Sequence, residues 1–287
     1  MSGYSLRRAR VRRNIKLELE EDDMSTESVD DSSVSVSSDD EEIKEDIIEY
    51  KVSNSDTFVV KPKTFYERHE VPRKIFHSLT APWVLLLYVT GQNQRTFVNF
   101  LIVVTLICFG QDLLRFKFPK FNDWFTKLYG PVMRSSERNG FNGIGFFLIG
   151  LLYNCAYMPK DMTIVSSMFL SWGDTTASLA GREFGKYTPK ITKNKSLAGF
   201  LANFVVSTLI CYFFYGIVVP YFHATVDLPG DIWYEPEHSQ IKLPFFGVIC
   251  GFVSASAELI EFVDDNLTIP IVTSTIMYGI IYVSKTN

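Results

Sequence analysis

Long apolar segments separated by short polar ones fill the chain from about residue 75 to its end, and they constrain the fold more than any other feature. Most of them hold about 17 to 25 residues with few charges, the length that a helix needs to cross about 30 Å of hydrocarbon. A soluble single-domain enzyme is thereby excluded. Because backbone groups must be satisfied internally in a bilayer, the sequence predicts an all-α fold, a polytopic bundle of about seven transmembrane helices. The expected spans are residues 75–90, 96–114, 141–158, 161–180, 197–222, 243–262 and 268–284.

The first 64 residues differ in composition from the rest. They contain 10 basic and 16 acidic residues, many serines and few large apolar side chains. Too little apolar surface is available there to offset the entropy of the chain. We therefore predict two parts, a disordered acidic tail over residues 1–64 and a multi-span membrane domain over residues 65–287. The basic cluster from Arg7 to Arg13 is followed by no apolar stretch, which is atypical of a signal peptide.

Two serines of the tail, Ser37 and Ser38, directly precede the acidic run from Asp39 to Glu42. A solvated charge run is the simpler interpretation. The sharper one is an acceptor site for an acidophilic protein kinase, because a phosphate there would add charge to a segment that already repels itself.

Basic residues are concentrated in alternate loops. The segments 115–140 and 181–196 carry most of them, whereas the segment 223–242 carries one lysine among four carboxylates. Cytosolic loops of membrane proteins are enriched in Lys and Arg. The N-terminal tail and both basic loops are therefore expected on the cytosolic side.

Ionisable residues near or within apolar spans are expensive and are functional candidates by default. The first group is Arg73, Lys74 and His77, where the histidine shares a helical face with the two cations. Stop signals at a helix end account for Arg73 and Lys74 equally well, but not for His77. The second group begins at Asp174 and continues through small residues to Gly181 and Arg182, a pattern that suits an anionic ligand and a carboxylate for Mg²⁺.

Two further groups lie at the starts of later spans. Lys195 and Ser196 precede the fifth span, where the free N–H groups of a helix N-terminus favour phosphate. Glu258 lies in the sixth span, and Asp264, Asp265 and Asn266 follow it. Helix capping by Asp265 or Asn266 is one interpretation of the last group, and metal binding together with Asp174 is the other.

All four groups fall on one membrane face under this topology. Together they supply cations, carboxylates, small residues and helix starts, which is the inventory for transfer of a phosphoryl or nucleotidyl group with Mg²⁺. The sequence lacks both the G-x-x-x-x-G-K-[ST] loop and the protein kinase signatures, so those two folds are rejected. The four cysteines are single and lie within apolar runs, which argues against a disulfide framework or a zinc site.

In this order, the four groups resemble the motifs of the integral-membrane family of CTP-using lipid kinases and phosphatidate cytidylyltransferase-like enzymes, which includes dolichol kinase and phytol kinase. The matching patterns are R-K-x-x-H, D-T-x-A-x-x-x-G-R-x-x-G, K-S-x-x-G and D-N-x-x-x-P, and they begin at Arg73, Asp174, Lys195 and Asp265. The acidic tail and the stretches around His69, Leu170 and Tyr187 to Gly199 are most similar to the fungal CTP-dependent diacylglycerol kinases.

This resemblance implies an enzyme that phosphorylates diacylglycerol with CTP to give phosphatidate, in the endoplasmic reticulum and nuclear membranes, with its active site cytosolic. Its partners would be CTP and membrane diacylglycerol and phospholipid, and no nucleic acid; its cofactor would be Mg²⁺ or Ca²⁺. The general base could be His77 or a carboxylate. The implied catalytic residues are Arg73, Lys74, His77, Asp174 and Lys195; the implied cofactor-binding residues are Thr175, Gly181, Arg182, Gly185, Ser196, Gly199 and Asn266; and the implied metal ligands are Asp174, Asp264 and Asp265.

Two alternatives stay open at this point. The first is a related enzyme, either a dolichol kinase or a cytidylyltransferase that keeps CMP and releases pyrophosphate. The second is a transporter or membrane scaffold, because the broken helices of transporters also hold charges near helix N-termini. Product formation that depends on CTP would distinguish the enzymes from the transporter.

Overall fold

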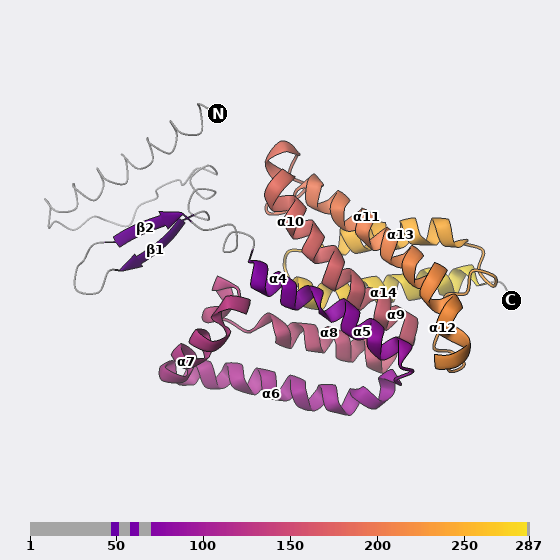
Figure 1. Cartoon of the computed structure of the whole chain (residues 1–287), viewed down its shortest axis with the longest axis horizontal. Coiled ribbons are helices and arrows are strands. Elements are labelled where there is room, and N and C mark those ends of the chain that lie inside the picture. The colour runs from indigo at the N-terminus through magenta and orange to yellow at the C-terminus, as the bar shows by residue number, and fades with distance from the viewer. Residues whose placement is uncertain (1–46, 52–57, 63–69, 286–287) are drawn as a thin grey trace, which may run out of the picture. The chain divides into compact units, whose positions relative to one another are not determined.

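The computed structural model describes residues 47–51, 58–62 and 70–285, which belong to two separate units, residues 1–62 and 63–287 (Figure 1). In the first unit, β1 (Ile47–Lys51) and β2 (Phe58–Pro62) pair antiparallel, with Tyr50 opposite Val59. The sequence predicts disorder across residues 1–64, and this hairpin departs from that expectation because β-branched residues recur in both strands. Ser37 and Ser38 lie outside the described residues.

The second unit is helical throughout its described part apart from short connections and isolated bridges. Its longer helices are α4 (Val71–Ser78), α5 (Thr80–Val89), α6 (Phe97–Lys117), α7 (Pro119–Tyr129), α8 (Gly143–Tyr157), α9 (Lys160–Met168), α10 (Thr175–Phe184), α11 (Leu197–Phe213), α12 (Val219–Val226), α13 (Leu243–Ala257) and α14 (Asp265–Ser284). Two π-helical segments, η4 (Phe169–Asp174) and η6 (Phe214–Val218), join α9 to α10 and α11 to α12. Short 3-10 turns are η1 (Gln94–Thr96), η2 (Gly130–Val132), η3 (Ser135–Arg138) and η5 (Gly185–Tyr187).

The expected all-α membrane bundle is confirmed, although not every span is. Among the described residues, three helical stretches are long and apolar enough to cross a membrane, namely Gln94–Lys117, Leu197–Val226 and Asp265–Ser284. Gly143–Tyr157 and Leu243–Ala257 are apolar but shorter. Each predicted span overlaps helix in the structure, although the sixth, residues 243–262, extends beyond α13, which ends at Ala257. The number of crossings stays a prediction.

The outer face of α6 has the character of a surface in contact with lipid. Large apolar side chains there are exposed, including Leu106 at 68% and Phe100 at 62% of their full area. In a soluble protein, a contiguous apolar surface of this kind would favour aggregation. The same exposure is expected when hydrocarbon is the solvent.

One helix forms the centre of the second unit. All residues of α9 are buried, and α9 continues through η4 into α10 (Figure 1). Its polar side chains are satisfied locally: Ser167 donates to the carbonyl of Thr163 at 2.7 Å, and Ser166 accepts a hydrogen bond from Asn154 of α8 at 3.0 Å. Small polar residues paired in this way let helices pack closely inside a bilayer.

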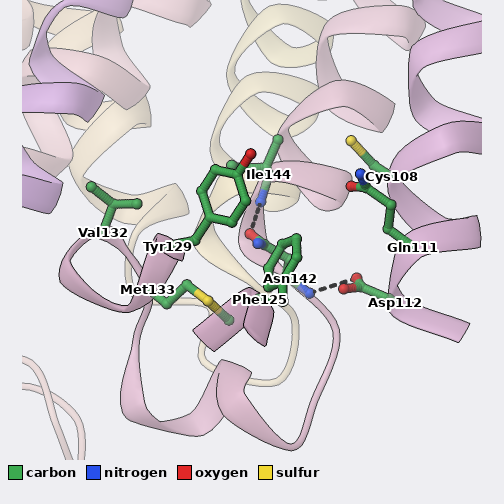
Figure 2. A pocket seen from close by; sticks show the side chains of 9 residues that line it. All are labelled: Cys108, Gln111, Asp112, Phe125, Tyr129, Val132, Met133, Asn142 and Ile144. Carbon is green, nitrogen blue, oxygen red and sulfur yellow. Dashed lines mark hydrogen bonds between the residues drawn. The ribbon is translucent and has the colours of Figure 1, made fainter. Parts of the chain in front are cut away.

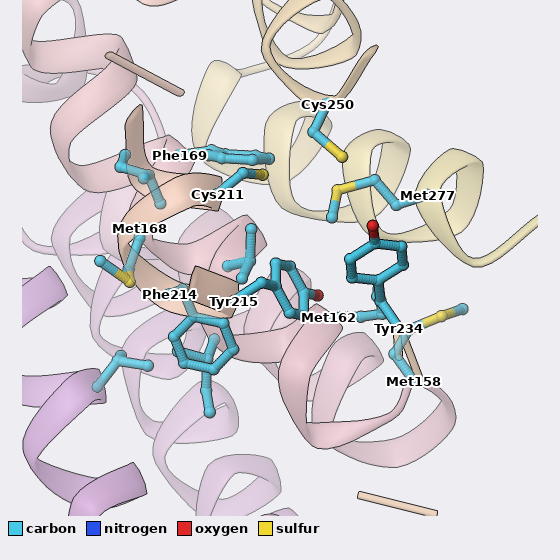
Figure 3. Packing of buried hydrophobic residues seen from close by; sticks show 14 of the residues in the cluster. Met158, Met162, Met168, Phe169, Cys211, Phe214, Tyr215, Tyr234, Cys250 and Met277 are labelled. Carbon is cyan, nitrogen blue, oxygen red and sulfur yellow. The ribbon is translucent and has the colours of Figure 1, made fainter. Parts of the chain in front are cut away.

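The apolar core lies around this central helix (Figure 3). Met162 and Phe169 share this core with Phe214 and Tyr215 of η6; Phe169 lies beside Cys211 of α11, and Met277 of α14 lies beside Cys250. Tyr234 stacks on Phe246 with ring centroids 3.9 Å apart. Dense packing of this kind fixes the position of η4, the segment that ends at Asp174.

The helix that begins with α4 is interrupted before α5, and two side chains of η4 bond to the backbone groups at this interruption. Pro82 has no N–H group, so the carbonyl of Ser78 four residues earlier loses its helical donor. Trp172 Nε1 donates to that carbonyl at 3.1 Å. Ser171 inserts its hydroxyl into the preceding turn, donating to the carbonyl of His77 at 2.7 Å and accepting from the N–H of Ala81 at 3.1 Å. The backbone groups freed by the break are therefore paired inside the protein, as a membrane environment requires.

The far end of the central helix carries a separate polar network. Asp161 accepts hydrogen bonds from the N–H groups of Trp233 and Tyr234 and from the hydroxyl of Tyr215. Lys160 pairs with Asp227 at 3.1 Å. Thirteen residues of helix separate this network from Asp174, or about 20 Å at 1.5 Å per residue. The segment 227–242 is thereby fixed at the end of the unit opposite to Asp174.

Candidate functional site

Residues from all four predicted groups meet at one end of the helical unit. Nε2 of His77 on α4 lies 3.9 Å from Oδ2 of Asp174 at the end of η4. Nζ of Lys195, in the loop before α11, lies 3.1 Å from Oδ2 of Asp265 at the start of α14. The charge of Lys195 also acts on Asp174, which connects the two pairs. The structure thus brings together the segments that we predicted to lie on one membrane face.

Asp174 lies at the centre of this arrangement. Asp174 is only 8% exposed, and its side chain does not cap α10, the helix that follows it. The basic side chains that interact with its charge come from three separate segments and are His77, Lys195, Lys74 and Arg134. A π-helical segment ends at this residue, and such irregular turns are frequent at functional sites.

His77 makes one close polar contact besides Asp174. Its Nε2 lies 3.0 Å from the carbonyl oxygen of Leu170. A carbonyl only accepts hydrogen bonds, so Nε2 must carry the proton and donate it. In this arrangement Nε2 cannot also accept a proton from a substrate.

Glu70 links two arginines of the first and second groups. Its carboxylate lies 2.5 Å from Arg73 and 3.0 Å from Arg182. Burial alone would raise the pKa of Glu70, but the two guanidinium groups outweigh it and lower that pKa below its usual value. The carboxylate therefore stays ionised and holds both arginines beside the start of α4.

Lys195 is held by two carboxylates. Its Nζ lies 3.3 Å from Glu258 and 3.1 Å from Asp265, and Glu258 also accepts a hydrogen bond from Asn203 at 2.7 Å. Burial alone would lower the pKa of Lys195, but the neighbouring carboxylates outweigh it and raise that pKa above the usual value for lysine. Lys195 is therefore a cation throughout the physiological pH range.

Asp264 and Asn266 make specific structural contacts. Asp264 caps α14 by accepting from the N–H of Asn266 at 2.9 Å, and its other oxygen lies 3.1 Å from Arg134. The amide of Asn266 donates to the carbonyl of Gly143 at 3.2 Å, which joins α14 to α8. Capping in this loop thus belongs to Asp264 rather than to Asp265 or Asn266.

The glycines of the second and third motifs lie where α10 meets the start of α11. A Cβ atom on Gly199 would lie 2.9 Å from the carbonyl oxygen of Ala177, and one on Gly185 would lie 3.0 Å from Oγ of Ser196. Gly181 faces the same contact. Ser196 caps α11 by accepting from the N–H of Gly199 at 3.4 Å. These residues bring the two helices close together, and this places Lys195 near Asp174.

The donor set fits a cation that binds together with a nucleotide. Mg²⁺ usually takes one or two carboxylates, keeps several waters and gains its other ligands from substrate phosphates. In the described part of the chain, no group of three or more His, Cys, Asp or Glu side chains forms a complete metal cage. Asp174 and Asp265 are close enough for their charges to act on each other, whereas both oxygens of Asp264 are engaged. Asp174 and Asp265 are therefore the candidate ligands.

A separate cavity of about 190 Å³ lies between α6, α7 and α8 (Figure 2). Asp112 accepts from the N–H of Asn142 at 2.8 Å on one side of it, and pairs with the buried Arg115 at 2.7 Å. The i, i+3 pairing of these two residues agrees with their spacing in the sequence. The lining contains none of the predicted site residues.

Three residues of the site were not singled out from the sequence. Glu70 precedes the first motif by three residues, Arg134 lies in a basic loop assigned only to topology, and Asn203 lies inside an apolar span. Asn203 could have been identified from the sequence, because a polar amide at membrane depth requires a hydrogen-bond partner. The other two are recognised only once the fold brings their partners near.

Comparison with known proteins identifies several similar chains. The chain is 39% identical over 223 residues to CTP-dependent diacylglycerol kinase 1 of Saccharomyces cerevisiae, covering 77% of each chain. It is 41% identical over 224 residues to the protein of the same name in Eremothecium gossypii, covering 77% of this chain and 70% of that one. The corresponding Schizosaccharomyces pombe protein is 37% identical over 214 residues, which are 74% of this chain and 94% of that one. No family model matches the chain, and no solved structure matches it.

Proposed function

The chain belongs to the family of CTP-dependent diacylglycerol kinases, and from that premise we propose how its converging charges carry out the reaction. The enzyme transfers the γ-phosphoryl group of CTP to diacylglycerol and forms phosphatidate. The observation that supports this site is the position of Asp174 among cations from separate segments. The fungal diacylglycerol kinases expected from the motifs are the relatives found, and the dolichol kinase, cytidylyltransferase and transporter alternatives are not favoured.

The transfer makes one bond and breaks another. The hydroxyl oxygen of diacylglycerol forms a bond to the γ-phosphorus, while the bond from that phosphorus to the β,γ-bridging oxygen breaks. CDP leaves with the electron pair of the broken bond, and the hydroxyl proton passes to a base. Because the transition state of such transfers is loose, catalysis depends mainly on positioning and on charge stabilisation.

The cations around Asp174 would provide that charge stabilisation. Lys195 and Lys74 both act electrostatically on Asp174, so both lie near the point where the triphosphate would meet a metal-binding carboxylate. Arg73 and Arg182 are held together by Glu70 beside α4 and would bind phosphate oxygens further out. Fixed cations need no reorganisation during the reaction, which is the condition for strong electrostatic catalysis.

Asp174 and Asp265 would hold the divalent cation, Mg²⁺ or Ca²⁺. Such an ion would supply positive charge to offset the negative charge that develops during transfer. The roles of Thr175, Ser196 and the motif glycines would be indirect, through the close approach of α10 and α11. Asn266 would fix the start of α14, and with it Asp265.

His77 is proposed to be a positioning residue, because its Nε2 proton is bonded to the carbonyl of Leu170. We propose that a carboxylate of the site, rather than the Nδ1 atom of His77, takes the hydroxyl proton. Gln can donate a hydrogen bond from an amide but cannot take up a proton at neutral pH. We therefore expect His77→Gln to keep turnover within about tenfold of the wild type, whereas His77→Ala, which also loses the hydrogen bond to Leu170, should lose more turnover than His77→Gln. Loss of a general base in either variant would instead cost about 10²–10⁴-fold.

The pH profile separates the two roles of His77. If His77 only positions Leu170 and Asp174, His77→Gln should retain the acidic limb of the wild-type profile of kcat/KM. A Gln variant as inactive as the Ala variant, with normal expression and an altered acidic limb, would identify His77 as the base.

One assay tests the proposed function directly. Purified protein in detergent micelles is given CTP labelled at the γ-phosphate, with diacylglycerol, dolichol or phosphatidate as the lipid. Label should enter phosphatidate from diacylglycerol, and ATP should substitute poorly. Equal use of ATP would remove the preference for cytosine, and label released only in pyrophosphate with phosphatidate as the lipid would identify a cytidylyltransferase.

We propose that the enzyme lies in the endoplasmic reticulum and nuclear membranes with its tail and active site in the cytosol, where CTP is available. Lys186 lies near the start of α11 and Glu235 lies in the segment that follows α12, so the 30-residue stretch from Leu197 to Val226 separates them. Basic loops on the Lys186 side support this orientation. Ser37 and Ser38 remain proposed acceptors for an acidophilic protein kinase.

Cysteine labelling in sealed microsomes checks the orientation. Lys186→Cys and Glu235→Cys are made separately in a background that lacks the native cysteines. An impermeant thiol reagent should label the first variant in intact vesicles and the second only after the membrane is opened. Labelling of both from outside would mean an incorrect number of crossings between residues 197 and 262.

A further inference from the structure

A groove of about 310 Å³ lies between α4 and α10, beside the site. Its lining on α4 is a stripe at helical spacing that includes Lys74, Ser78 and Leu79, and its lining on α10 is Thr175 and Leu179. Val71 and Ile75 complete it. The groove has no assigned role in the mechanism above.

The two sides of the groove differ in polarity. Lys74 and Thr175 are buried at its inner side, whereas Ile75, Leu79 and Leu179 are exposed by 57%, 60% and 36%. In a membrane protein, exposed apolar side chains around an opening can contact lipid hydrocarbon without an unfavourable free energy of exposure to water. The groove therefore joins a lipid-facing rim to a polar inner end.

The polar end adjoins the reacting centre. Thr175 follows Asp174 directly in the chain, and Lys74 is coupled electrostatically to Asp174. The hydroxyl groups of Ser78 and Thr175 are 3.4 Å apart, well beyond the usual 2.7–2.8 Å for a hydrogen bond between hydroxyl groups. Such a weak mutual bond leaves both hydroxyls able to bind another oxygen.

We propose that this groove binds the acceptor diacylglycerol, with its glycerol oxygens at Ser78 and Thr175 and an acyl chain leaving over Leu79 and Leu179. This inference rests on the proposed kinase function and adds the path of its lipid substrate. Lys74 is the one charged residue in the lining, and the charge of Asp174 acts on it. The two hydroxyls suit the uncharged oxygens of diacylglycerol, and the ammonium group of Lys74 already interacts with the charge of Asp174.

Filling the groove should weaken acceptor binding selectively. In mixed micelles, Leu179→Trp should raise the KM for diacylglycerol about tenfold, because added volume in a fitted space is unfavourable. The KM for CTP should stay at the wild-type value. Leu106→Trp on the exposed face of α6 is the matched control and should change neither constant. An unchanged KM for diacylglycerol in Leu179→Trp, or an equal rise in both constants, would overturn the proposal.

Crosslinking supplies a measurement that does not depend on turnover. A diacylglycerol carrying a photoreactive group on one acyl chain should label α4 and α10, and excess diacylglycerol should prevent this labelling while phosphatidylcholine should not. Label located elsewhere, or equal competition by phosphatidylcholine, would exclude a specific acceptor groove. If Leu179→Trp fails to fold, Leu79→Trp fills the groove from the opposite helix. Wild-type protein that is labelled here but transfers no phosphate from CTP would refute the kinase function and leave the groove as a neutral-lipid site.

Discussion

Asp174→Asn should reduce turnover by at least on the order of 10²–10³-fold, the usual effect of removing one essential electrostatic contact. Asn has nearly the shape of Asp, so the packing of η4 should be retained while the negative charge is lost. The cations around this position would then face one another without the carboxylate that now attracts them. Initial rates with labelled CTP and diacylglycerol, at saturating concentrations of both, measure the loss.

A control variant separates this effect from a general effect of charge. Asp123→Asn removes a carboxylate from the exposed side of α7 and should keep wild-type turnover. Both variants should reach the membrane in equal amounts, because removing a carboxylate does not hinder insertion. Near wild-type turnover in Asp174→Asn would defeat the assignment of this residue.

Lys195→Met should lower turnover by on the order of 10²-fold and should also lower the thermal stability of the purified protein. The loss of turnover follows if the ammonium group stabilises the transferring phosphate. The loss of stability follows because Glu258 and Asp265 would be left without their shared counter-ion, and an uncompensated buried carboxylate is destabilising. Lys186→Ala, in the same basic loop but exposed, should change neither quantity.

A double variant distinguishes the two effects at Lys195. Adding Glu258→Gln to Lys195→Met removes the buried negative charge, so the melting temperature should recover while turnover should not. Recovery of turnover together with stability would mean that Lys195 acts only as a counter-ion. Comparing Tm with initial rate in the four proteins of the cycle measures both outcomes.

The membrane fold and the need of Asp174 for compensating partners were predictable, because the cost of charge in hydrocarbon is a local property of the sequence. An aspartate between apolar residues 161 and 180 requires compensation wherever the helix lies. The same reasoning extends to His77 and Lys195, and the structure places both near Asp174. The sequence did not distinguish the acceptor side of the site, because the groove between α4 and α10 depends on how two helices approach each other.

Other features depended on tertiary structure and could not be inferred from spacing. Gly199 fits a phosphate-binding turn and a helix contact equally well in sequence, and only the position of Ala177 opposite to it shows the contact. Asp264 and Asp265 are adjacent and chemically identical. The start of α14 makes one a cap and points the other at Lys195. Arg134 comes from a loop 40 residues before Asp174, so no local pattern connects them.

The break between α4 and α5 has a mechanical consequence. Ser171 and Trp172, which bond to the carbonyls of His77 and Ser78, immediately precede the turn that carries Asp174. Any shift of the central helix therefore pulls the end of α4 along with it, and α4 carries Arg73, Lys74 and His77. Because the two sides of the site are clamped to each other rather than to the lipid, undulation or thinning of the bilayer should carry them together as one rigid body.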